Sequence, residues 1–93
     1  MSKVYLITYD LNSEGQNYEN VIQSIKDSAL YWCTYWDSSF LIKSNLTANQ
    51  IFDKIKPYID SNDRLIIIEA NPANHQGWLE KDQWAFVNEK IFG

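Results

Sequence analysis

KVYLITYD, residues 3–10, is the stretch that decides the fold of this chain. Its β-branched and aromatic side chains favour an extended strand, and both parities of the stretch are mostly apolar. That pattern is typical of a central strand that is covered on both faces. We expect the strand to span Lys3–Tyr9. Asp10 then lies where the strand passes into a loop, so its carboxylate is held firmly within reach of water or a metal ion.

Further helices and strands are predicted along the rest of the chain. Periodicity and turn residues predict a helix over Asn17–Asp27, strands over Leu30–Trp36, Phe40–Lys43 and Arg64–Ala70, and a last helix over Glu80–Phe92. With a helix between the last two strands, the order is βαββαβ. Right-handed crossovers place both internal helices on one face of an antiparallel sheet. The sequence therefore predicts a single α+β domain over residues 1–93, a ferredoxin-like βαββαβ sandwich with an additional C-terminal helix.

The helix between the last two strands has the clearest start in the sequence. Thr47 and Gln50 have the spacing of a capping box, in which each side chain accepts the backbone N–H of the other residue. Leu46 and Ile51 occupy the positions of a hydrophobic staple. Pro57 must end or kink this helix, because it has no N–H to donate. We expect the core to be set by Leu6, Ile22, Ile25, Ile51, Ile55 and Ile67.

The pattern of the last strand predicts a partner. Residues 65–68, LIII, form a continuous apolar run, which predicts a strand that is buried on both faces. Two helices cover only one face of the sheet. The C-terminal helix covers part of the other face, and a large uncovered apolar area is unfavourable in water. We therefore expect a second copy of the chain to cover the rest, as a homodimer.

Composition narrows the class of protein. The chain of 93 residues has a formal net charge of −4, which disfavours a broad electrostatic surface for nucleic acid, although local contacts remain open. The single cysteine, Cys33, allows no internal disulfide and is expected to be a small buried side chain. His75, the only histidine, is expected to lie solvated in a loop. No apolar run suggests a signal peptide or a membrane segment, so we expect a cytoplasmic protein.

Four motifs in combination resemble one protein superfamily. They are VYLITYDLN at residues 4–12, GQNY at 15–18, YWCTYWDSSFLIKS at 31–44 and DSNDRLIII at 60–68. From residue 3 to about residue 70 the chain is similar to the CRISPR-associated second adaptation protein and its relatives, the virulence-associated D toxins. Within that superfamily it resembles most the short bacterial proteins labelled SinR-like. The resemblance implies a ferredoxin-like fold and a dimer.

The resemblance also implies a site. In that superfamily the carboxylate that closes the first strand binds magnesium across a dimer and supports phosphodiester cleavage, and the matching residue is Asp10. The serine–apolar motif of the family hairpin falls at Ser39-Phe40. Asn12 and Ser13, in the loop that follows Asp10, are together with Ser39 the candidates for contacts with nucleic acid or a protein partner.

Two interpretations of Asp10 stay open. A lone carboxylate is a poor magnesium site, because Mg²⁺ prefers octahedral oxygen ligands, but two copies of Asp10 that face each other across a two-fold axis supply two. Alternatively, Asp10 caps a turn or the start of the next helix, since Asp is a common turn former.

These features favour one function over two others. The acidic charge and the lack of a second candidate acid or base favour a non-catalytic or weakly active dimeric module that binds a protein partner, in a defence or toxin–antitoxin setting. The alternative is a metal-dependent nuclease, an endoribonuclease or endonuclease that uses Asp10 and Mg²⁺. A regulator that binds nucleic acid without cutting it is the least favoured, because the sequence has no basic patch.

Overall fold

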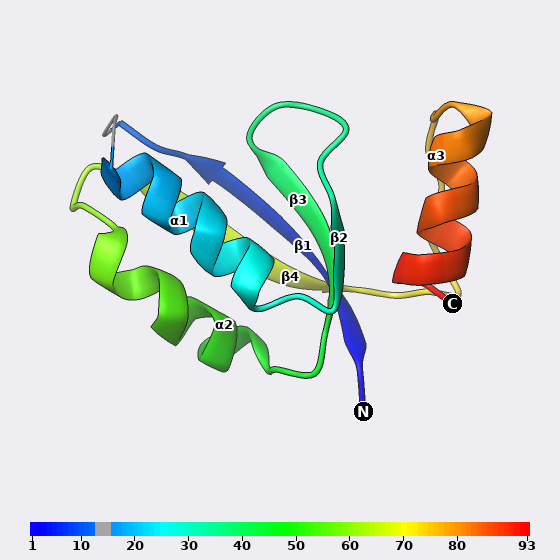
Figure 1. Cartoon of the computed structure of the whole chain (residues 1–93), viewed down its shortest axis with the longest axis horizontal. Coiled ribbons are helices and arrows are strands. Elements are labelled where there is room, and N and C mark those ends of the chain that lie inside the picture. The colour runs from blue at the N-terminus through cyan, green and yellow to red at the C-terminus, as the bar shows by residue number, and fades with distance from the viewer. Residues whose placement is uncertain (13–15) are drawn as a thin grey trace.

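The computed structural model describes residues 1–12 and 16–93 of the chain (Figure 1). Its elements are β1 (Lys3–Asp10), α1 (Gln16–Asp27), β2 (Tyr31–Cys33), β3 (Ser39–Ser44), α2 (Ala48–Ile55), the 3₁₀ turn η1 (Lys56–Tyr58), β4 (Arg64–Ala70), α3 (Lys81–Phe86) and the π-helical turn η2 (Val87–Ile91). The strands form one antiparallel four-stranded sheet in the order β2-β3-β1-β4. The fold is therefore of the mixed α+β class, as the sequence predicts.

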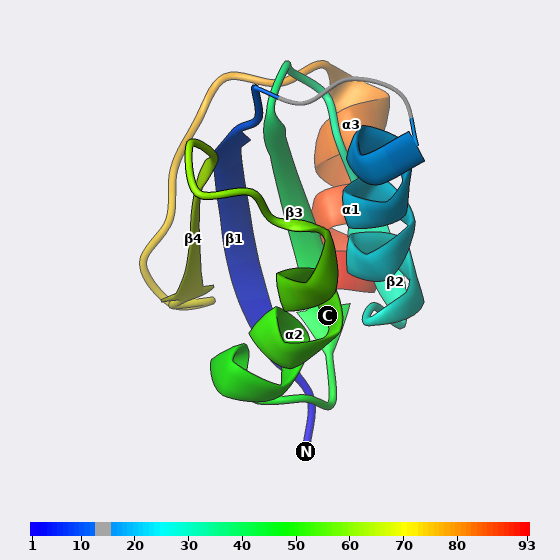
Figure 2. The same cartoon turned by 90° about the vertical axis from the view of Figure 1, so that its left-hand side faces the viewer.

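The helices lie on both faces of the sheet. Figure 2 shows α1 and α2 in front of the sheet, α3 behind it and β4 at its left edge. We call the side under α1 and α2 the helix face; Tyr5 and Ile7 of β1 are buried there. We call the opposite side the second face. Leu6, Thr8 and Asp10 of β1 belong to the second face, because successive side chains of a strand alternate between faces.

The start and end of α2 agree with the sequence. The backbone N–H of Gln50 donates to Oγ1 of Thr47 over 3.1 Å, and the backbone N–H of Thr47 donates to Oε1 of Gln50 over 2.9 Å. The predicted capping box is thus confirmed. The α-helix ends at Ile55, and Pro57 lies in the 3₁₀ turn that follows it. A residue without an N–H is accepted there, because it lies in the first turn of the new segment.

The C-terminal helix covers only part of the second face. The predicted helix over Glu80–Phe92 is present as α3 followed by η2. Val87 and Ile91 of η2 are buried against Val4 of β1 and Cys33 of β2. This cluster lies over the half of the sheet that holds β2, β3 and the start of β1. No helix in the described part of the chain is long and apolar enough to cross a membrane.

Two details of the sequence prediction are wrong, one in the core and one in the length of a strand. Ile25, Ile51 and Ile55 are fully buried as expected, whereas the other three predicted core residues, Leu6, Ile22 and Ile67, are only partly buried. The strand predicted over Leu30–Trp36 is limited to Tyr31–Cys33.

The prediction that β4 is buried on both faces is also wrong. Ile66 and Ile68 are 53% and 50% exposed. The reason is topological, because the strand order puts β4 at an edge of the sheet, and of its residues only Ala70, the last, packs against the cluster around η2.

Candidate functional site

Asp10 lies at the exposed end of β1, on the second face. Its neighbour across the sheet is Arg64 of β4, and the next pair on the same face is Thr8 with Ile66. Within residues 1–12 and 16–93, the Asp10 carboxylate has no hydrogen bond or ion pair. The guanidinium of Arg64 instead donates to the carbonyl oxygens of Ser61 and Asp63, over 3.2 and 2.8 Å. Among the described residues, the Asp10 carboxylate is therefore unengaged, and it lies at the edge of an apolar surface.

The other predicted contact residues have structural roles. The backbone N–H of Asn12 donates to Oδ1 of Asp63 over 2.7 Å, and its side-chain amide donates to the carbonyl oxygen of Asn62. Ser39 is buried, and its hydroxyl donates to Oγ1 of Thr8 over 3.1 Å. Ser13 lies outside the described residues. The structure thus anchors Asn12 and Ser39 by hydrogen bonds; Asn12 is exposed like Asp10, whereas Ser39 is buried.

Asp63 is the carboxylate that organises this end of the molecule. It is buried, and it accepts the backbone N–H of Asn12 through Oδ1 and that of Asp60 through Oδ2, over 2.7 and 2.9 Å. These bonds tie the loop after β1 to the turn before β4. From the sequence, DSND at residues 60–63 is simply a turn. Among the described residues, Asp63 is thus the carboxylate that accepts backbone N–H groups at this end of the sheet.

A metal ion at Asp10 would find few protein ligands among the described residues of one copy. Residues 1–12 and 16–93 contain no cluster of three or more His, Cys, Asp or Glu side chains that could hold a metal ion. Asp10 alone offers one carboxylate, whereas Mg²⁺ in proteins is usually held by one or two carboxylates together with waters and substrate phosphates. A magnesium site at Asp10 would need ligands from outside this copy of the chain.

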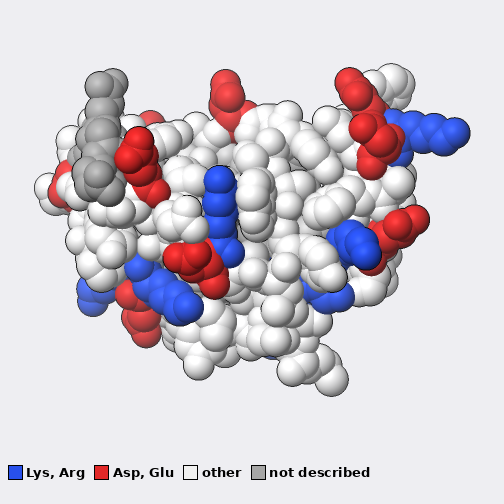
Figure 3. Space-filling view, viewed as in Figure 1, with Lys and Arg blue, Asp and Glu red and all other residues white. Residues whose placement is uncertain are grey.

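Several basic side chains are already engaged with the protein. The Nζ atoms of Lys26 and Lys90 lie 4.5 and 5.7 Å from the ring centroids of Trp32 and Tyr31, which are cation–π contacts that the sequence does not reveal. On the face in Figure 3, the acidic and basic groups of the described residues are interspersed and form no continuous basic surface. A surface that binds nucleic acid through its phosphates usually gathers Lys and Arg on one side, which the face in Figure 3 does not do.

Cys33 is not a candidate nucleophile. Its side chain is buried, and burial raises the pKa of the thiol to about 11. The reactive thiolate is therefore scarce at neutral pH. The prediction that Cys33 is a small buried side chain is confirmed.

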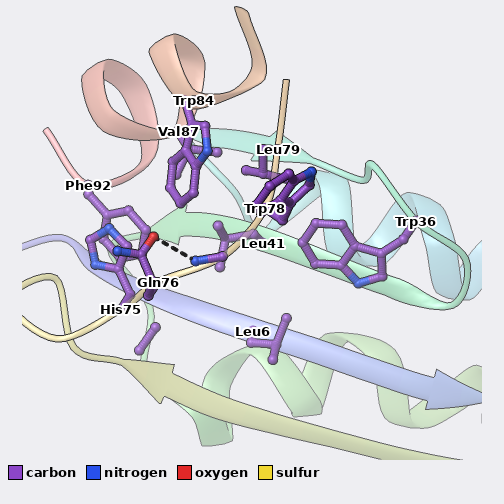
Figure 4. A pocket seen from close by; sticks show the side chains of 12 residues that line it. Leu6, Trp36, Leu41, His75, Gln76, Trp78, Leu79, Trp84, Val87 and Phe92 are labelled. Atoms are coloured by element: carbon purple, nitrogen blue, oxygen red, sulfur yellow. Dashed lines mark hydrogen bonds between the residues drawn. The ribbon is translucent and has the colours of Figure 1, made fainter. Parts of the chain in front are cut away.

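An apolar pocket of about 330 Å³ opens between the second face and the C-terminal segment. Figure 4 shows Leu6 and Leu41 on the sheet, Trp84 and Val87 on the helical side, and Trp36 and Trp78 together at one end. None of the described residues that line it is Asp, Glu, Lys or Arg. We call it the tryptophan pocket.

The two ends of the tryptophan pocket differ. At one end the ring of His75 stacks on Phe92, with centroids 4.0 Å apart and planes 7° apart. His75 is exposed in a loop, as expected, and it also packs on the C-terminal segment. At the other end Trp78 is 99% exposed. Tryptophan is among the residue types that dominate binding at protein interfaces. The pocket therefore has the chemistry of a binding surface for an uncharged apolar group.

No protein-family model matches this sequence, and a search of curated proteins finds no match. The functional interpretation accordingly depends on the geometry of Asp10, the exposed surface along β4 and the tryptophan pocket.

Proposed function

We propose that the chain is a homodimeric ferredoxin-like module that binds a protein partner and has little or no catalytic activity. The strand order β2-β3-β1-β4, with α1 and α2 on one face, supports the ferredoxin-like arrangement. The observation that carries the proposal is the apolar surface along β4. Phe52 of α2 and Ile66 and Ile68 of β4 are 38%, 53% and 50% exposed. We call these three residues the β4 surface.

A second copy is the occupant that we propose for the β4 surface. Phe52 lies on the helix face of this edge and Ile66 and Ile68 lie on the second face, so apolar side chains flank the open edge on both sides. Exposed apolar areas can mark interaction sites on small proteins. A domain of this size also buries a modest share of its surface, so association adds stability that the monomer lacks.

The protein partner is assigned to the tryptophan pocket. The uncharged lining and the exposed Trp78 suit an apolar or aromatic side chain of a partner. The assignment to a toxin–antitoxin or defence setting is part of the proposal and depends on the family resemblance of the motifs in residues 4–68.

The dimer is tested directly by its mass. Sedimentation equilibrium at micromolar concentration should give a species of twice the 10.9 kDa chain mass. A single species of 10.9 kDa under the same conditions would contradict the proposed module.

The second candidate function is a magnesium-dependent nuclease, and one observation favours it. Asp10 is exposed on the second face and has no partner within the described residues. Its carboxylate is therefore available to bind a cation or a substrate. In a dimer that brings the two Asp10 side chains together, one ion could bind both carboxylates and stabilise the leaving oxygen or activate water.

Asp10→Asn separates the two functions. Wild-type protein should cut RNA and DNA weakly or not at all, because the chain is acidic and offers one candidate carboxylate. If cleavage occurs, it should require Mg²⁺ or Mn²⁺ and vanish in Asp10→Asn, since the amide keeps the shape but loses the charge that a hard cation prefers. The unfolding free energy should change by less than about 0.5 kcal/mol, because Asp10 is exposed.

The control for this assay is the metal-free wild type. Strong cleavage that needs the metal and is lost in Asp10→Asn would replace the binding module with the nuclease. Cleavage that survives the substitution would instead indicate a contaminant or another site.

A further inference from the structure

The outer edge of β4 is open. In the described chain, β4 pairs only with β1 and lies last in the strand order. Its seven residues, RLIIIEA, contain no proline and no lysine, and both charged residues, Arg64 and Glu69, lie near the ends. Proteins usually protect a long apolar edge with a charge, a proline or a bulge, because its free N–H and C=O groups accept another strand. The middle of β4 has no charge and no proline.

We propose that β4 pairs with β4 of a second copy, antiparallel, about a two-fold axis at Ile67. The inference rests on the proposed homodimer and specifies its geometry. In this register Ile67 lies opposite the partner's Ile67, and Ile66 lies opposite the partner's Ile68. The two sheets join into one sheet of eight strands, with α1 and α2 of both copies on the same face.

The sequence of β4 selects this register. When the axis lies at Ile67, the middle residue, each of the seven residues of β4 has an opposite residue in the partner strand. If the axis lies at any other position, residues at the strand ends have no opposite residue. If the axis instead lay between two residues, each residue of the helix face would oppose a residue of the second face. The helices of the two copies would then lie on opposite sides of the joined sheet. In the proposed register Glu69 lies opposite the partner's Leu65, and Arg64 lies opposite the partner's Ala70. Like charges therefore do not face each other in this register. Like charges directly opposite each other would destabilise a sheet.

The side chains on both faces of β4 support a second copy as the occupant. On the second face, Ile66 and Ile68 form apolar cross-strand pairs with their counterparts, which stabilise a sheet. On the helix face, a hollow of about 270 Å³ between α2 and β4 is lined by Phe52, Leu65 and Ile67, among others. An added β4 brings the same apolar side chains to this hollow, so the edge is complementary to itself.

This geometry has a consequence for Asp10. Asp10 lies opposite Arg64, three residues from Ile67, so the two copies of Asp10 are six residues apart along the strands, about 20 Å at the usual rise. They are also three strand spacings apart across the joined sheet, about 14 Å. The separation is then about 25 Å, far beyond the span of a single metal ion with ligands at about 2 Å. Edge pairing therefore leaves no shared magnesium site.

Cysteine cross-linking tests the register. Ile66→Cys and Ile68→Cys are made as separate variants, and their mixture is refolded together and oxidised. Residues opposite each other in an antiparallel pair have Cα atoms about 4.5–5.5 Å apart, within the range of a disulfide. The mixture should give a covalent dimer, whereas each variant alone should give at least tenfold less, because position 66 opposes position 68. Wild type is the control, since its only thiol, Cys33, is buried.

Hydrogen exchange on wild-type protein gives an independent measure. Alternate amides of β4 point away from β1 in an antiparallel pair. They should exchange about tenfold or more slowly in the dimer than at a concentration low enough to give monomer, because pairing protects them.

The outcomes separate this inference from the proposed function. A disulfide in the mixture together with protected β4 amides supports edge pairing. A covalent dimer from either single variant, or unprotected amides in a protein that still sediments as a dimer, would overturn edge pairing and leave the homodimer intact. A monomeric wild type would overturn both.

Discussion

Replacing Ile55 with alanine should lower the free energy of unfolding by about 2–5 kcal/mol, the range for truncating a large side chain in a core. Ile55 is fully buried, and it packs with Ile51 in the cluster under α1 and α2. α2 has only eight residues, too few to be stable as an isolated helix in water, so its stability comes from packing. The alanine leaves a cavity where this short helix meets the sheet.

Urea unfolding at one fixed protein concentration measures the loss, because the stability of a dimer depends on concentration. Lys54→Ala is the matched control, since Lys54 is the exposed neighbour of Ile55 on the same helix. Its effect should stay within about 0.5 kcal/mol, as for most surface substitutions. A loss below that level in Ile55→Ala would show that the buried face of α2 contributes little to the core.

The local elements were predictable because their determinants are local. Thr47, Gln50 and Pro57 fix the start and end of α2 through hydrogen bonds that span three residues or fewer and through a missing N–H. The alternation in β1 and the capping box depend on no distant residue. For the same reason the α+β class and the order of elements could be predicted from the sequence.

The exposure of β4 could not be predicted, because it depends on strand order. A run such as LIII has the same local pattern in a central strand and in an edge strand. What exposes Ile66 and Ile68 is the position of β4 beside β1 alone, together with a C-terminal segment that packs near Val4 and Cys33.

The roles of the carboxylates of the candidate site also depend on contacts that are distant in the sequence, so they could not be predicted either. Asp10 and Asp63 both follow from the sequence as turn residues. Asp63 is the buried acceptor because residues about fifty positions apart meet there, with Asn12 donating to Asp63. Periodicity carries no information about that contact, so the structural role of Asp63 and the exposure of Asp10 are known only from the fold.

Ile68→Lys should weaken the dimer. Ile68 is half exposed in a single copy, so the lysine reaches water in the monomer and the fold is retained. In the dimer, the lysine would replace one side chain of the apolar cross-strand pair with the partner's Ile66, and such pairs contribute about 0.2–1 kcal/mol each. Each dimer carries two copies of the substitution. The dissociation constant should therefore rise by about two- to thirtyfold, which corresponds to about 0.4–2 kcal/mol for the two pairs.

Leu30→Lys is the matched control for this substitution. Leu30 is 53% exposed, nearly the same fraction as Ile68, but it precedes β2 at the opposite edge of the sheet. The same change in charge and size at Leu30 should leave the dimer intact in sedimentation equilibrium. If Leu30→Lys dissociates the dimer and Ile68→Lys does not, the contact between copies involves the β2 edge, and the aromatic side chains beside it take the role that we assign to β4. If neither variant dissociates it, the two copies meet away from both edges, and a face-to-face arrangement that brings the Asp10 side chains together becomes the leading geometry.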